Sequence, residues 1–134
     1  MTRRMILLTC AAAFLGALSW TGTPRALAVK QFKDQFEAKY VKKDSRNPKD
    51  KQFAALVAKA KCNICHEGTS KKNRNVYGRE LAKLLDRRKD KNNVKKIRQA
   101  LDTVAKLRSN PKDKRSPTFG ELIARGQLPA GNPK

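Results

Sequence analysis

Two cysteines and a histidine stand close together near the middle of the chain, in the run Cys62-Asn63-Ile64-Cys65-His66. Thiols and imidazoles are the side chains that bind metals, form disulfides and make covalent links to cofactors. The C-x-x-C-H spacing is the attachment signature of c-type haem, in which both thiols bond to the porphyrin edge and the adjacent imidazole binds the iron. The motif therefore predicts one covalent haem c, held by Cys62 and Cys65, with His66 as the proximal iron ligand.

Other uses of these side chains fit the sequence less well. A redox-active C-x-x-C pair is expected in a thioredoxin-like βαβ unit, and no such unit is apparent. A structural zinc site takes four ligands, whereas this segment offers Cys62, Cys65 and His66. The whole chain has 3 cysteines and 1 histidine, so a framework of several disulfides is excluded. A single Cys62–Cys65 disulfide stays open as the alternative, in a basic, exported binding protein.

Residues 1–28 have the layout of a secretory signal peptide. Two early arginines precede a mainly apolar run over residues 6–20, and Ala26 and Ala28 place small residues at the positions that define cleavage. The apolar run is shorter than the roughly 20 residues that span a membrane. We expect export by the Sec or the Tat route, cleavage after Ala28, and a periplasmic protein of residues 29–134.

The segments that must position the motif are predicted to be helical. Phe32, Phe36 and Tyr40 recur every four residues, which places them on one face of a helix. Similar spacing and start signals predict helices over about 30–43, 48–61, 77–88 and 93–108, and a short last helix that begins near Ser116 and ends at Gly126. No stretch shows the alternation of a strand. We therefore expect one all-α domain over residues 29–134, with a thin core.

With this order of elements around the motif, the chain resembles the small monohaem c-type cytochromes of class I. The resemblance covers residues 29–134 and implies a cytochrome c-like helical domain wrapped around the haem. It implies that Tyr77, in the segment Val76-Tyr77-Gly78, contacts a haem propionate. It also implies a close helix crossing that involves Ala54 and Phe119.

Three departures separate the chain from that family. The family usually has an aromatic residue where Ala58 stands. It often has a proline after the motif whose carbonyl orients the histidine, whereas no proline lies between His66 and Pro111. A different carbonyl must therefore accept the His66 Nδ1 proton. The family's usual distal ligand is methionine or a second histidine, and residues 29–134 contain neither.

The distal iron position therefore stays open. In the class I layout this ligand comes from the loop before the last helix, which here makes Lys112 the first candidate and Lys114 the second. A lysine binds iron only as its neutral amine. The α-amine of Val29 and the phenol of Tyr77 are further candidates. The position is otherwise vacant or filled by a partner chain, and Lys112 and Lys114 are then part of an ordinary solvated basic loop.

The chain is strongly basic, with 32 lysine and arginine residues, 11 aspartate and glutamate residues and a formal net charge of +21. The signal segment carries three of the arginines and no acid, so residues 29–134 keep 29 basic and 11 acidic residues, a charge of +18. Such a charge favours an acidic redox partner protein or an anionic membrane surface. Nucleic acid is not expected, because the protein is exported and has no nucleic-acid motif.

These features predict a periplasmic carrier of single electrons, not an enzyme that uses side-chain catalysis, because the iron does the chemistry and the protein tunes it. The alternative is a haem protein with an open or exchangeable distal site. Such a protein would sense a gas or peroxide, or act as the haem subunit of a larger complex.

Overall fold

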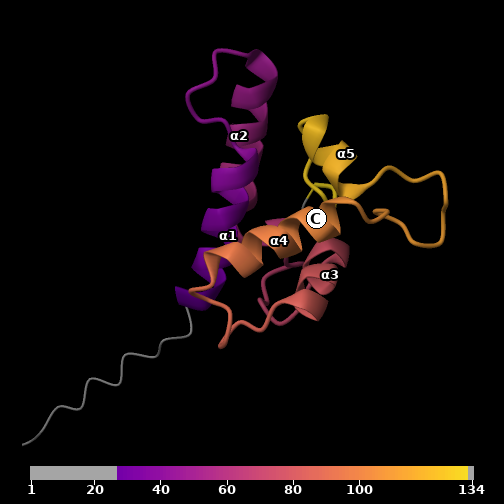
Figure 1. The fold of residues 1–134 in the computed structure, drawn as a ribbon. Coiled ribbons are helices and arrows are strands. Elements are labelled where there is room, and N and C mark those ends of the chain that lie inside the picture. Colours follow the sequence, from indigo (N-terminus) through magenta and orange to yellow (C-terminus); the bar gives the residue numbers. More distant parts are fainter. Residues whose placement is uncertain (1–26, 133–134) are drawn as a thin grey trace, which may run out of the picture.

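The computed structural model describes residues 27–132, and most of the predicted signal segment lies outside this range. The elements in chain order are α1 (Leu27–Tyr40), α2 (Pro48–Ala60), the 3-10 helix η1 (Lys61–Ile64), α3 (Val76–Leu84), α4 (Val94–Ala105) and α5 (Phe119–Ala124) (Figure 1). Within residues 27–132 the only strand-like pairings are two isolated bridges, His66–Arg74 and Arg108–Thr118. The predicted all-α fold is confirmed for this range. No helix in it is long and apolar enough to cross a membrane.

Polar side chains fix where the helices begin. Asn47, Asn75 and Asn93 precede α2, α3 and α4, and each side-chain oxygen accepts a hydrogen bond from a backbone amide in the first turn. At α5, Thr118 and Glu121 each accept a hydrogen bond from the other's backbone amide, which forms a capping box. The helix boundaries agree with the predicted ranges to within a few residues, and α3 ends four residues earlier than expected.

Helix α4 is the central element of the core. It packs against α1, α3 and α5 (Figure 1). Beside it, Tyr77 of α3 lies edge-on to Phe36 of α1 and to Phe119 of α5, with ring centroids 6.0 and 5.2 Å apart. Each of these three residues is at most 1% exposed. The aromatic face predicted on the first helix therefore joins the core through Phe36, and Phe119 contacts Tyr77.

Helix α3 touches the cysteine motif at Gly78. A Cβ atom at this position would lie 1.9 Å from the carbonyl oxygen of Cys65 and 2.8 Å from its carbonyl carbon. Only glycine allows two backbones to approach so closely. The backbone amide of Asn75 also donates to the Cys65 carbonyl, at 3.2 Å. The start of α3 is therefore packed directly onto the backbone of the motif.

We expect Gly78→Ala to destabilise the fold by about 3 kcal/mol, because the new methyl group meets backbone atoms and can be relieved only if α3 and the motif separate. Urea unfolding followed by circular dichroism measures the loss. Gly68→Ala is the matched control: its φ is +64°, but nothing lies within 4 Å of a Cβ there. It should cost only about 1 kcal/mol for the left-handed backbone. Equal losses in the two variants would contradict the close approach.

Candidate functional site

The C-x-x-C-H motif forms one tight turn directly after α2. Helix α2 ends at Ala60, because the next residue, Lys61, has a φ of 50° and a ψ of −115°, outside the helical region. The backbone amides of Cys65 and His66 then both donate to the carbonyl of Cys62, at 3.2 and 3.1 Å. The two thiols and the imidazole that the sequence predicts as site residues are therefore held together on a single short segment of backbone.

The two cysteines differ in their surroundings. Both are free thiols and both are partly exposed. Cys65 packs against the core cluster, and burial raises the pKa of its thiol to about 12, with a smaller contribution from neighbouring Cys62. The Cys65 thiol is therefore protonated at pH 7. Redox-active C-x-x-C pairs instead depend on a stabilised thiolate, so the site does not favour dithiol redox chemistry.

The loop that follows the motif orients the His66 ring. Its Nδ1 lies 3.2 Å from the carbonyl oxygen of Asn73. A carbonyl can only accept, so Nδ1 carries the proton and Nε2 keeps a free lone pair. Burial lowers the pKa of His66, the Asn73 carbonyl opposes this, and Arg74 and Lys71 lower it further. At pH 7 the ring is neutral, which is the form that binds a metal ion. Asn73 thus supplies the carbonyl that the missing proline required.

Asn75 is a buried polar residue of the site that the sequence interpretation missed. Its amide nitrogen donates to the carbonyls of Asn63 and Ile64, both at 3.1 Å, and of His66, at 3.3 Å. Its side-chain oxygen accepts from the backbone amide of Gly78 at 2.9 Å. An asparagine directly before a helix is a recognisable N-cap signal. That signal predicts the hydrogen bond that the Asn75 oxygen accepts from the Gly78 amide. It does not predict the three hydrogen bonds that the Asn75 nitrogen donates to the motif.

Tyr77 is fully buried in the first turn of α3, and its hydroxyl finds no hydrogen-bond partner among residues 27–132. Burial raises the pKa of the phenol, and Cys65 raises it further. The next residue, Gly78, lies against the Cys65 backbone, so this turn of α3 is next to the motif. An unpaired buried hydroxyl costs about 1–3 kcal/mol. Such a group calls for a specific explanation, and a hydrogen-bonding group on a bound cofactor would provide one.

The predicted distal ligand lies elsewhere. Lys112 and Lys114 are exposed and belong to the connection between α4 and α5, which extends to one side of the helices (Figure 1). The base of this loop is closed by its own hydrogen bonds, including one from the Ser109 amide to the Pro117 carbonyl at 2.9 Å. The structure therefore brings Cys62, Cys65, His66 and Tyr77 together, and it does not bring Lys112 to them.

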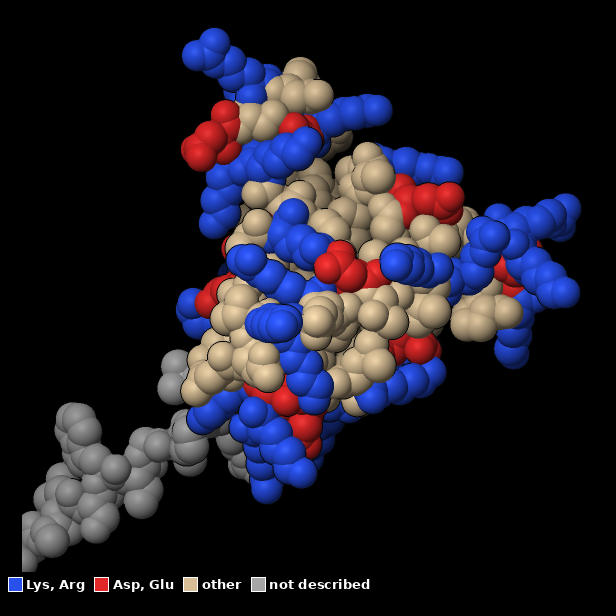
Figure 2. All heavy atoms as spheres, viewed as in Figure 1, with Lys and Arg blue, Asp and Glu red and all other residues tan. Residues whose placement is uncertain are grey.

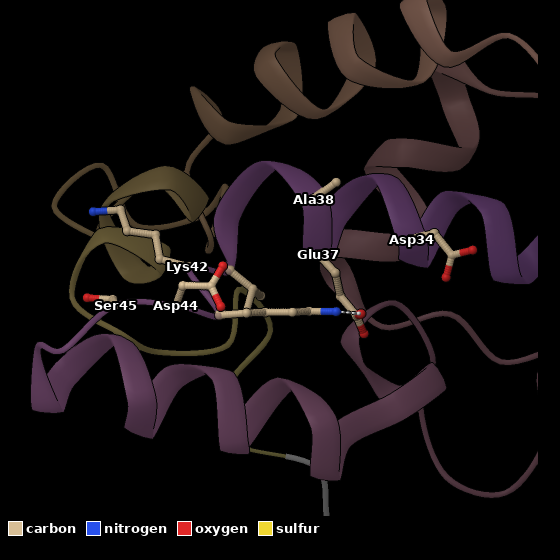
Figure 3. A pocket seen from close by; sticks show the side chains of 8 residues that line it. Asp34, Glu37, Ala38, Lys42, Asp44 and Ser45 are labelled. Atoms are coloured by element: carbon tan, nitrogen blue, oxygen red, sulfur yellow. Dashed lines mark ion pairs between the residues drawn. The ribbon is translucent and has the colours of Figure 1, made fainter.

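A hollow of about 700 Å³ lies beside the turn between α1 and α2 (Figure 3). Three carboxylates line it, from Asp34, Glu37 and Asp44. Lysines pair with the first two, since Lys30 lies 2.7 Å from Asp34 and Lys43 lies 3.7 Å from Glu37. None of its lining residues belongs to the cysteine motif, and its chemistry is that of a solvated ion-paired surface.

A second hollow, of about 770 Å³, separates α2 from the segment that follows α5. Leu56, Leu122 and Leu128 give it an apolar lining, and Lys59 and Arg125 add two basic groups. Lys59 precedes the first cysteine of the motif by three residues. Gln52, Gln127 and Asn132 also line it, and none of its lining residues belongs to the cysteine motif.

Within residues 27–132, no group of three or more histidine, cysteine and acidic side chains is placed to hold a metal ion by itself. Cys62, Cys65 and His66 thus share a turn without surrounding a common point. The turn offers two thiols for covalent bonds and one imidazole nitrogen for a single metal bond.

Comparison with known proteins finds no relative of this chain. No family model matches the chain, and neither the curated proteins nor the solved structures contain a significant match. The function must therefore be inferred from the chain's own residues, namely a C-x-x-C-H turn with free thiols, a neutral oriented imidazole and a strongly basic surface.

Proposed function

We propose that the protein is a periplasmic c-type cytochrome that carries single electrons on one covalently attached haem. The observation that carries this proposal is the C-x-x-C-H turn, in which Cys62 and Cys65 are free and partly exposed and His66 has a free Nε2. The haem iron supplies the chemistry, since it gains and loses one electron. The protein's task is to bind the haem, orient its ligand and recognise partners.

Each residue of the site would have a separate role in binding the haem. Cys62 and Cys65 would hold the haem as thioethers, in which each sulfur bonds to a former vinyl carbon and the thiol hydrogen goes to the adjacent carbon. His66 would bind the iron through Nε2, with its ring fixed by the Asn73 carbonyl. The unpaired hydroxyl of Tyr77 is available as a donor to a propionate.

The core supports the same proposal, because a small domain with few large apolar residues often needs a cross-link or a cofactor to be stable. The bound haem would add apolar contacts that the chain alone does not provide.

Covalent attachment is the first expectation to test. Expressed with a cytochrome c maturation system, the purified protein should stain for haem after denaturing electrophoresis and keep its haem in acidified acetone. Cys62→Ala and Cys65→Ala should each strongly reduce or abolish the stained band. Asn63→Ala, between the two cysteines, is the matched control and should stain normally. Wild-type protein whose haem is extracted by acidified acetone would refute the thioether bonds.

The position of Lys112 favours a second candidate function, a haem protein with an open or exchangeable distal site. An exposed amine on a loop that extends from the helices is poorly placed to bind the same iron as His66. This second function differs from electron transfer, because an open iron site binds small ligands.

The ferric absorption spectrum separates the two candidates. An electron carrier whose iron has a sixth ligand should give a low-spin ferric spectrum. An open distal site should give a high-spin spectrum that cyanide converts to low-spin, and Lys112→Ala should leave that spectrum unchanged. Arg115→Ala, which removes a basic side chain from the same loop, is the matched control, and Lys114→Ala tests the second candidate ligand. A low-spin spectrum at neutral pH that becomes high-spin on acidification, and is lost in Lys112→Ala alone, would instead identify Lys112 as the distal ligand. Protonation of the amine is the cause of that pH dependence.

An acidic redox protein is the partner that the surface charge favours, with an anionic membrane surface as the other proposed contact. Figure 2 shows lysine and arginine side chains spread widely over the visible face and its edges, with fewer acidic side chains among them. The charge therefore acts as a broad attractive field and is not confined to one patch. The net positive charge should steer association with an acidic partner.

We expect the association rate with a small acidic electron-transfer protein to fall at least about tenfold as the Debye length shortens from about 30 Å at 0.01 M to about 8 Å at 0.15 M. Stopped-flow measurement of electron transfer provides the rate. Replacing Lys112, Lys114 and Arg115 by Gln, or instead Arg87, Arg88 and Lys91, removes the same charge from two different loops. Both triple variants should slow association by similar factors. A rate that ignores ionic strength would contradict electrostatic steering.

A further inference from the structure

We propose that Asn75 is a positioning residue for the proposed haem ligand: its amide fixes the cysteine motif and the loop that orients His66 relative to each other. This inference rests on the proposed function, because it concerns the proximal side of the same site. It assigns a role to a side chain outside the C-x-x-C-H motif.

The hydrogen bonds of Asn75 reach almost the whole motif. The side-chain amide has two hydrogens, and carbonyls of Asn63, Ile64 and His66 all lie within 3.3 Å of its nitrogen. The backbone amide of Asn75 donates to a fourth motif carbonyl, that of Cys65. The residue is only 9% exposed, so water competes little for these bonds. Asn75 therefore holds the turn from Asn63 to His66 as a unit.

The loop that Asn75 ties to the motif also carries the group that orients the imidazole. Asn73 lies two positions earlier, and its carbonyl accepts from the Glu67 amide at 3.0 Å as well as facing His66 Nδ1 at 3.2 Å. The loop between Glu67 and Asn75 is thus tied to the motif at both ends. If the Asn75 bonds are lost, the Glu67 bond remains, but the loop that carries the Asn73 carbonyl loses its second anchor to the motif.

Helix capping alone does not account for this side chain. Asn47 and Asn93 cap α2 and α4 with their oxygens. Within residues 27–132, neither has an amide nitrogen that donates to another segment. An N-cap needs only an acceptor, whereas the contacts of Asn75 need a donor as well. Aspartate keeps the acceptor but has no donor when ionised, and serine has a single hydroxyl hydrogen.

The expected effect on the haem follows from the Nδ1 hydrogen bond. A carbonyl that accepts the Nδ1 proton makes the imidazole a stronger electron donor to the metal. Stronger donation favours ferric iron, so a loosened bond should raise the midpoint potential. A purely structural role for Asn75 would lower stability without moving this potential.

The test compares haem-loaded Asn75→Ser with haem-loaded Asn93→Ser. Serine remains a good N-cap in both variants, so α3 and α4 should keep their starts. We expect Asn93→Ser to match the wild type in haem loading and in midpoint potential. Asn75→Ser should load less haem and show a more positive midpoint potential by spectroelectrochemical titration. Asn75→Asp, which places a carboxylate against three carbonyls, should load still less.

Each outcome is decisive. An Asn75→Ser potential equal to that of Asn93→Ser, with the wild type loaded, overturns the positioning role and leaves the proposed function intact. A wild type that binds no haem overturns both. If Asn75→Ser loads too little haem for titration, haem loading is compared with that of Thr118→Ala. This variant removes the capping box of α5, so its loss of loading shows the effect of lower stability alone. A loss in Asn75→Ser no greater than this overturns the proposal, and a clearly greater loss supports it.

Discussion

The backbone contact between α3 and the cysteine motif is the constraint on which the rest of the structure depends. Gly78 brings the first turn of α3 so close to the Cys65 carbonyl that no side chain fits between them. The next residue back, Tyr77, points from the same turn into the core and contacts Phe36 and Phe119. One turn of helix therefore joins the motif to the core. Any movement of the motif must displace α3, and any loss of core packing must loosen the motif.

This contact links the protonation states of Cys65 and His66 to the stability of the fold, which has only a small apolar core. Burial keeps the Cys65 thiol protonated and the His66 ring neutral at pH 7. Folding lowers the pKa of His66, so the unfolded chain binds a proton at this residue more readily than the folded chain does. The fold therefore loses stability as the pH falls through the ordinary histidine range, about 6.5, towards the lower folded value. Metal binding by the neutral ring would oppose protonation in the same range.

The helices and the motif residues could be predicted from the sequence, because they depend on local spacing. The contacts that depend on the path of a loop could not. Periodicity located α1, α2 and α4 well, because apolar faces and caps are local signals. It extended α3 to residue 88, but the helix ends at Leu84, because Asp86 and Asp90 accept backbone amides of the following turn. The motif residues were evident from their types. The contacts of Asn75 were not, because they join residues 9 to 12 positions apart across an irregular loop.

The irregular loop and the glycine after it give the site a pattern that is longer than its motif. Eight residues separate His66 from Asn75, and two separate Asn75 from Gly78, so the structural unit reads C-x2-C-H-x8-N-x2-G. The five-residue motif alone is short enough to arise by chance in many chains. The extended pattern also demands a donor-bearing cap and a residue without a side chain at fixed distances. Distant relatives with this proximal loop should be recognisable by that pattern even where nothing else in their sequences aligns.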